Sequence, residues 1–115
     1  MNKKSLKQIA RDSQALVERA RNDKLDLSDL EGGCTTVSNL GAFGINDSIV
    51  VPGQCTILGV GKITDTCVPD NGNILVRKLM NMTLSVDHKV ANGAYAAQFL
   101  DFVRTLLEDP KGFAV

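Results

Sequence analysis

The chain lacks most features that indicate nucleic-acid or membrane binding. Its 115 residues include no tryptophan, one tyrosine and four phenylalanines, so it offers no aromatic platform on which bases could stack. Thirteen basic and thirteen acidic side chains cancel, which argues against a nucleic acid or a membrane surface bound mainly by charge. No apolar run approaches the roughly 20 residues that span a bilayer, and the first residues lack the apolar core of a signal peptide. We therefore expect no nucleic-acid partner and no membrane partner.

Cysteine is also scarce. Cys34, Cys55 and Cys67 are odd in number and widely spaced, and no Cys-x-x-Cys pair occurs. This pattern favours reduced thiols in a cytosol-like, cytoplasmic compartment and argues against a metal site. Each cysteine lies in a β-rich stretch, so we expect all three to be small buried hydrophobic residues.

The remaining pattern is a helix, then strands, then a helix. Ser5 and Gln8 are spaced as a capping box, and an apolar stripe follows at helical intervals. The periodicity predicts one helix over 6–21 and another that begins after Asn92 and ends before Pro110. It also predicts strands over 34–39, 56–60, 62–68 and 74–86, and a tight turn over 70–73. A chain of this length forms one small domain. We predict an α/β (α+β) two-layer sandwich with a mixed, mainly antiparallel sheet and flanking helices.

The only histidine, His88, lies where the last strand pattern ends and the last helix pattern begins. A strand-to-helix junction holds side chains rigidly at the edge of an α/β layer, so an imidazole there is a candidate general base. The alternative is a histidine with a structural role. Asn92 follows four residues later and has a structural explanation too, because asparagine is a favoured helix N-cap.

Three blocks of the sequence match known motifs. The segment 87–94, Asp-His-Lys-Val-Ala-Asn-Gly-Ala, is similar to His-x-x-x-Asp-Gly. Residues 32–44 resemble Gly-Gly-x-x-x-Ile-Ser-Asn-Leu-Gly-x-Phe-Gly, and residues 52–61 resemble Pro-x-Gln-x-x-Ile-Leu-x-Val-Gly. With these blocks in this order, the chain resembles the catalytic domain of the dihydrolipoamide acyltransferases, the core components of 2-oxoacid dehydrogenase complexes. Chloramphenicol acetyltransferases share the first motif, but the other two blocks favour the lipoamide branch. The resemblance spans residues 3 to 110.

The resemblance implies roles for three residues. His88 would be the general base that takes the proton from the thiol of coenzyme A or dihydrolipoamide. Ser38 would donate its hydroxyl hydrogen to the oxyanion of the tetrahedral intermediate, although a serine at a strand end also commonly bonds to nearby backbone. Asn92 would help to hold the site, in a position where the family usually has aspartate. Lys89 replaces the usual arginine and loses its planar two-pronged donor.

The resemblance also implies an assembly. A family catalytic domain is about twice this length, so residues 1–115 are expected to form one partial domain of the chloramphenicol acetyltransferase-like fold, with no lipoyl or subunit-binding domain. The family's site lies between neighbouring subunits of a trimer. We therefore expect a homo-oligomer, with another chain as a possible source of the missing half. Coenzyme A and lipoamide would be substrates, and no cofactor would be covalently bound.

Two functions remain open at this point. The first is acyl transfer, with acetyl favoured by residues 93–100 and with the isolated chain weak or inactive. The second is a non-catalytic assembly half-domain that keeps the family's oligomerisation surfaces. The length of one segment affects the choice between these functions. Between Gly44 and Pro52 the chain is about two residues shorter than is usual in the family, which could shift the strand that follows Ser38 and slow catalysis.

Overall fold

The computed structural model describes residues 4–113, which form two compact units. One unit contains residues up to Gly33 together with those from Val103 onward, and the other runs from Cys34 to Phe102. Both candidate catalytic side chains, those of Ser38 and His88, lie in the second unit.

The first unit is built around α1 (Leu6–Arg21), whose bounds match the predicted helix. The capping box forms as expected. The backbone N–H of Gln8 donates to the Ser5 hydroxyl at 3.3 Å, and the backbone N–H of Ser5 donates to the side-chain oxygen of Gln8 at 2.9 Å. A short helix, α2 (Leu27–Leu30), follows. The Arg19 guanidinium lies 2.6 Å from the Asp29 carboxylate and ties the end of α1 to α2.

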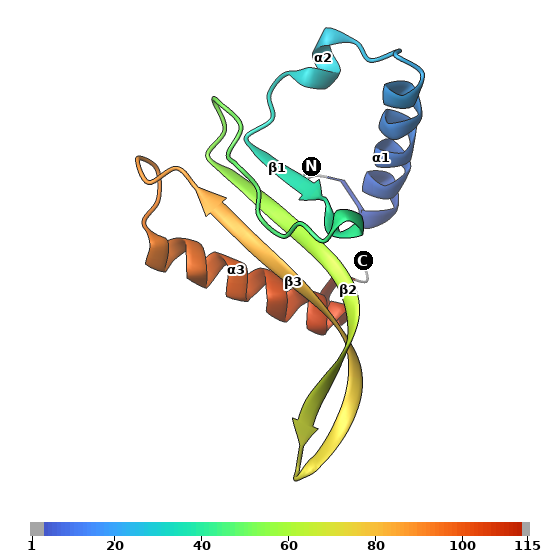
Figure 1. Ribbon diagram of the computed structural model, residues 1–115. Coiled ribbons are helices and arrows are strands. Elements are labelled where there is room, and N and C mark those ends of the chain that lie inside the picture. Colours follow the sequence, from blue (N-terminus) through green and yellow to red (C-terminus); the bar gives the residue numbers. More distant parts are fainter. Residues whose placement is uncertain (1–3, 114–115) are drawn as a thin grey trace. The chain divides into compact units, whose positions relative to one another are not determined.

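The second unit contains a mixed three-stranded sheet (Figure 1). Its strands are β1 (Thr35–Asn39), β2 (Thr56–Asp70) and β3 (Asn73–Val86), in the order β1-β2-β3. β1 pairs with β2 in parallel, and β2 pairs with β3 antiparallel, so the predicted mixed sheet is confirmed. The 3-10 helix η1 (Gly41–Phe43) follows β1, α3 (Gly93–Glu108) begins in this unit, and η2 (Pro110–Phe113) comes last.

The prediction of separate strands over 56–60 and 62–68 is wrong, because β2 is continuous through both. The irregularity at Gly61 and Lys62 is a β-bulge: pairing shifts between Val60, opposite Met82, and Ile63, opposite Met80. Two residues of β2 there oppose one residue of β3, which bends and twists the strand without ending it. A glycine within a strand pattern is as consistent with a bulge as with a strand end.

The β2–β3 turn forms where it was predicted. Asn71 and Gly72 both have positive φ, 48° and 84°, which is the geometry of a type I′ hairpin turn. Asparagine and glycine tolerate the left-handed region better than other residues, so this dipeptide fixes the register of the hairpin.

Registered residues of the three strands divide the sheet into two faces. Because paired residues point to the same side, Ser38, Gly59 and Thr83 share one face, and Leu58 and Leu84 share the other. We call the first the loop face, since residues 45–54 cross it, and the second the helix face, since the first turns of α3 lie against it (Figure 1).

The cysteines do not follow the sequence expectation. Cys34 and Cys67 are exposed and Cys55 is half-buried, and all three are free thiols. The expectation failed because it assumed that both faces of every strand would be covered. Among the hydrophobic side chains of residues 4–111, only Ile57 and Ala96 are buried, 5% and 9% exposed.

Candidate functional site

Asp87 organises the turn that carries His88. Its amide donates to the Cys55 carbonyl at 2.9 Å, which holds the end of β3 beside the start of β2. Its side-chain carboxylate accepts from the Lys89 amide at 2.9 Å, and its carbonyl accepts from the Val90 amide at 2.9 Å. A single aspartate therefore fixes the backbone on both sides of His88, whose side chain is exposed to solvent.

Asn92 caps the helix that follows. Its side-chain oxygen Oδ1 accepts from the Tyr95 amide at 2.9 Å, and its carbonyl accepts from the Ala96 amide at 3.1 Å. This confirms the N-cap expected from the sequence, and it satisfies amides that the first turn of α3 would otherwise leave unpaired. Asn92, four residues after His88, therefore marks the end of the His88 turn and the start of α3.

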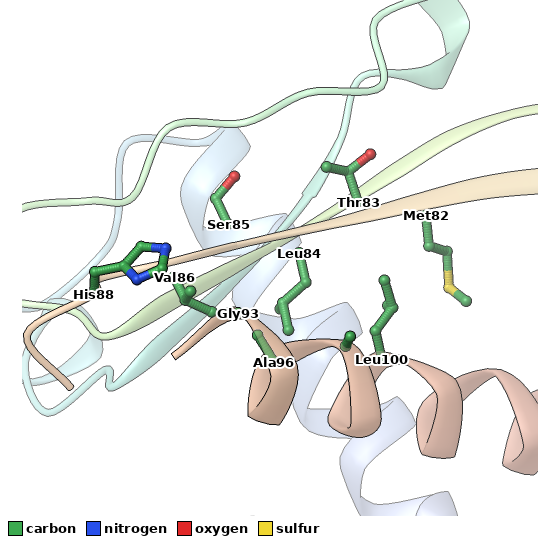
Figure 2. A pocket seen from close by; sticks show the side chains of 10 residues that line it. Met82, Thr83, Leu84, Ser85, Val86, His88, Gly93, Ala96 and Leu100 are labelled. Atoms are coloured by element: carbon green, nitrogen blue, oxygen red, sulfur yellow. The ribbon is translucent and has the colours of Figure 1, made fainter. Parts of the chain in front are cut away.

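His88 borders a cavity of about 550 Å³ between the end of β3 and the start of α3. Figure 2 shows Leu84 and Leu100 pointing into the space between strand and helix, and Thr83 and Ser85 pointing to the other side of the strand. The walls contributed by Leu84, Leu100 and Ala96 are apolar, and the His88 imidazole lies at one end. The arrangement suits a thin, largely apolar chain whose polar end reaches the imidazole.

Ser38 is half-buried on the loop face, and within residues 4–113 its hydroxyl forms no hydrogen bond. In the strand register Ser38 is level with Gly59 and Thr83, whereas His88 lies past the end of β3 at Val86. Along β3, the three-residue step from Thr83 to Val86 covers about 10 Å. Across the sheet, the two strand spacings from β1 to β3 cover about another 10 Å. A hydroxyl and an imidazole so placed cannot contact the same carbonyl group, so one chain does not bring Ser38 and His88 together.

The loop over residues 45–54 is the part of this site that the sequence did not predict. The Ser85 hydroxyl donates to the Ser48 carbonyl at 2.7 Å, and the Thr36 hydroxyl donates to the Gln54 side chain at 2.5 Å. Two residues before the Ser48 anchor, the backbone passes so close to β2 that a Cβ on Gly59 would lie 2.6 Å from the Asn46 carbonyl oxygen.

The sequence signal for this contact was the glycine itself. Gly59 and Gly61 interrupt an otherwise β-branched strand, and a glycine inside a strand often marks a close approach by other backbone. The crossing loop therefore lies directly on the face that carries Ser38, and its length bears on where that serine sits.

Neither a cluster of metal-ligating side chains nor a membrane-spanning helix occurs among the described residues. In the part of the chain that the structure describes, no three histidine, cysteine, aspartate or glutamate side chains are grouped closely enough to hold a metal ion. Among the same residues, no helix combines the length and apolar character that crossing a membrane requires.

Comparison with known proteins identifies relatives across the whole chain. Residues 1–115 match the family described as 2-oxoacid dehydrogenases acyltransferase (catalytic domain). The acetyltransferase component of the Rickettsia conorii pyruvate dehydrogenase complex is 36% identical over 111 residues, 95% of this chain and 27% of that protein. The succinyltransferase component of the Haemophilus influenzae 2-oxoglutarate dehydrogenase complex is 37% identical over 111 residues, again 95% and 27%. The chain thus spans about a quarter of the length of these relatives.

Solved structures of this kind share the fold. A crystal structure of Azotobacter vinelandii dihydrolipoamide acetyltransferase, studied for the catalytic role of a serine, a histidine and an asparagine, superposes with a TM-score of 0.87. It is 36% identical and covers 98% of this chain and 47% of the other. The cubic core of a pyruvate dehydrogenase multienzyme complex gives the same values.

These matches extend over nearly every described residue. They include the His88 turn and the two earlier sequence blocks, 32–44 and 52–61, and they agree in fold as well as in sequence. The chain belongs to the 2-oxoacid dehydrogenase acyltransferase (catalytic domain) family.

Proposed function

We propose that the chain takes part in acyl transfer between dihydrolipoamide and coenzyme A, with His88 as general base, Ser38 as oxyanion donor and Asn92 as a positioning residue. One observation carries the proposal. In the Azotobacter acetyltransferase the asparagine follows the histidine by four residues, as Asn92 follows His88. The serine and the histidine of that enzyme are two residues farther apart in sequence than Ser38 and His88 are. This difference equals the two-residue shortening between Gly44 and Pro52 that the sequence predicts.

The chemistry follows from the side chains. A thiol at neutral pH is mostly protonated, and the thiolate is the nucleophile. The His88 imidazole accepts the thiol proton as the sulfur attacks the thioester carbonyl. The Ser38 hydroxyl donates a hydrogen bond to the oxyanion that forms. As the intermediate collapses, the imidazolium returns the proton to the departing thiolate sulfur.

The separation of Ser38 from His88 within one chain supports a site built by two chains. The His88 of one copy would act on the same carbonyl as the Ser38 of another, and each copy would contribute to two such sites. A closed ring of identical subunits satisfies this requirement, and a trimer is the simplest ring with head-to-tail contacts. Membership in a family whose solved structures include a multienzyme core also supports assembly.

Substrate and compartment follow from the same proposal. Both acyl acceptors are thiols and stay reduced only in a reducing compartment, so we place the reaction in the cytoplasm, or in the mitochondrial matrix of a eukaryote. Acetyl is the proposed acyl group. An acetyltransferase and a succinyltransferase are almost equally similar to the chain, so sequence identity does not separate these two substrates.

The decisive experiment measures acyl transfer from acetyl-coenzyme A to free dihydrolipoamide by the chain and by its His88→Ala variant. Because general-base catalysis contributes about 100-fold or more, the variant should lose at least that factor in kcat. Cys67→Ser, a change in an exposed strand position far from His88 in the register, is the matched control and should keep full activity.

Slow transfer is expected from the isolated chain, because a single copy exposes much apolar surface that a complete domain would cover. Equal rates in the chain and in His88→Ala would contradict the proposal. They would leave an assembly half-domain as the function, and sedimentation would then show oligomers without activity.

A further inference from the structure

Cys34 and Cys55 are neighbours although they are far apart in the sequence. The Cys55 amide donates to the Cys34 carbonyl at 3.2 Å, immediately before the point where Thr35 of β1 pairs with Thr56 of β2. β1 and β2 are parallel, and neighbouring strands lie about 5 Å apart, so the Cα atoms of two residues joined across them by one backbone hydrogen bond are about 5–6 Å apart. A disulfide requires Cα atoms roughly 4.4–6.8 Å apart, so no large backbone movement is needed to join these two residues.

Both thiols are accessible. Cys34 is exposed and Cys55 is half-buried, neither is in a disulfide, and both border a second cavity of about 390 Å³. The rest of the wall of this cavity is mostly apolar, with Tyr95 and Phe99 of α3 among its side chains and with Thr35 and Thr56 also lining it. An oxidant can therefore reach the pair from solvent. Because Cys34 and Cys55 immediately precede the paired residues Thr35 and Thr56, alternation along the two strands places both side chains on the same face of the sheet.

We propose that Cys34 and Cys55 form a dithiol site that closes reversibly to an intrachain disulfide. With a disulfide oxidant such as oxidised glutathione, one cysteine thiolate attacks an S–S bond and releases one glutathione thiolate, which leaves a mixed disulfide. The second cysteine thiolate then attacks the protein sulfur of that mixed disulfide and releases the second glutathione. The two cysteines lose two electrons and two protons, and oxidised glutathione becomes two molecules of reduced glutathione.

The position of the pair connects it to the candidate catalytic turn. The carbonyl of Cys55 is the acceptor for the Asp87 amide, and Asp87 fixes the backbone around His88. A link at Cys55 therefore restrains the strand end to which this turn is bonded. The ring closed by the link would contain all of β1, including Ser38, and the crossing loop. The link itself does not depend on the proposed acyl transfer; only its consequence for turnover does.

The test equilibrates the purified chain, at low micromolar concentration, with mixtures of reduced and oxidised glutathione. Remaining thiols are blocked with N-ethylmaleimide, and peptides are mapped by mass spectrometry. We expect a mass about 2 Da lower, a Cys34–Cys55 peptide, alkylation at Cys67 alone, and reversal by dithiothreitol. Because the partners are held close together, the internal link should exceed glutathione adducts by roughly tenfold.

Variants separate the pair from ordinary oxidation. Cys67→Ser should form the link as the parent chain does, whereas Cys34→Ser and Cys55→Ser should carry only glutathione adducts. In the linked chain, exchange of the Asp87 amide hydrogen should slow about threefold or more, because its acceptor strand is restrained. A link that involves Cys67, a predominance of glutathione adducts or of chains joined to one another, or alkylation of all three cysteines would overturn the proposal.

Discussion

One hairpin contains two regions that differ in packing. In the packed end, formed by residues 56–61 of β2 and 82–86 of β3, every side chain is buried or half-buried. In the hairpin arm, residues 62–81, Ile63, Ile74 and Val76 of the helix face are 60%, 76% and 67% exposed. Both regions have strand-forming residues and the same ladder, so backbone pairing alone does not produce a core.

The difference comes from what lies against the two faces. In the packed end, the first turns of α3 lie against the helix face and the crossing loop lies against the loop face. The arm has neither within residues 4–113, and Figure 1 shows it continuing beyond the part of the sheet that these elements cover. The Lys78 ammonium and the Asp65 carboxylate, 3.2 Å apart, form an exposed cross-strand pair there, which contributes little. The arm therefore exposes apolar side chains that a partner could cover. The packed end holds the His88 turn in place, through the bond from the Asp87 amide to the Cys55 carbonyl.

The largest loss of stability is expected from a substitution where the packed end meets the arm. Gly41 of η1 is buried, and a Cβ at this position would lie 2.5 Å from the Lys62 backbone nitrogen. Because this neighbour is backbone and cannot rotate away, Gly41→Ala should lower the free energy of unfolding by about 3 kcal/mol. Denaturant unfolding measures the loss. Gly93→Ala, whose Cβ would have no atom within 4 Å, is the control, and an equal loss there would remove the steric explanation.

The next effect concerns the strand ends that carry Ser38 and His88. If each site takes its histidine from one copy and its serine from another, equimolar Ser38→Ala and His88→Ala chains should regain about one quarter of the parent activity after unfolding and reassembly together. Each variant alone should be at least about 100-fold slower. Steady-state transfer assays measure all three rates. A mixture no faster than the two variants would mean that each chain uses its own pair.

A smaller effect is expected from the arm. Replacing Ile74 and Val76 together by threonine keeps β-branched residues on the strand and removes apolar surface from its helix face. Self-association, measured by sedimentation, should weaken by about tenfold, while the free energy of unfolding changes by less than about 0.5 kcal/mol. Leu75→Thr, on the opposite face, is the control. Unchanged association in the double variant would exclude this face of the arm as the contact.

The smallest effect tests the anchor of the crossing loop. Ser85→Ala removes the bond to the Ser48 carbonyl and should cost about 1 kcal/mol of stability. Thr66→Ala in the arm loses only two long, exposed contacts, 3.4 Å to the Thr64 hydroxyl and 3.5 Å to the Thr64 carbonyl. It should change stability by less than about 0.5 kcal/mol. Thermal unfolding compares the two, and equal losses would mean that the arm and the packed end are held equally.

The sequence predicted the local structure because local patterns fix it. The Ser5 capping box, the Asn71-Gly72 turn and the Asn92 cap each act within a few residues, and all three formed where they were expected. The continuity of β2 and the exposure of Cys34 could not be predicted this way. Each depends on which distant segments lie across a strand, and periodicity does not report that.

By itself, the sequence determined the family, the two long helices, the hairpin turn and the identity of the candidate catalytic residues. Only the tertiary structure decided how those residues relate in space. The register of β1 on β2 and of β2 on β3 places Ser38 away from His88, and it places Cys34 beside Cys55. The physical reason is that strand pairing and the close passage of the crossing loop over Gly59 are contacts between remote segments, which no local propensity specifies.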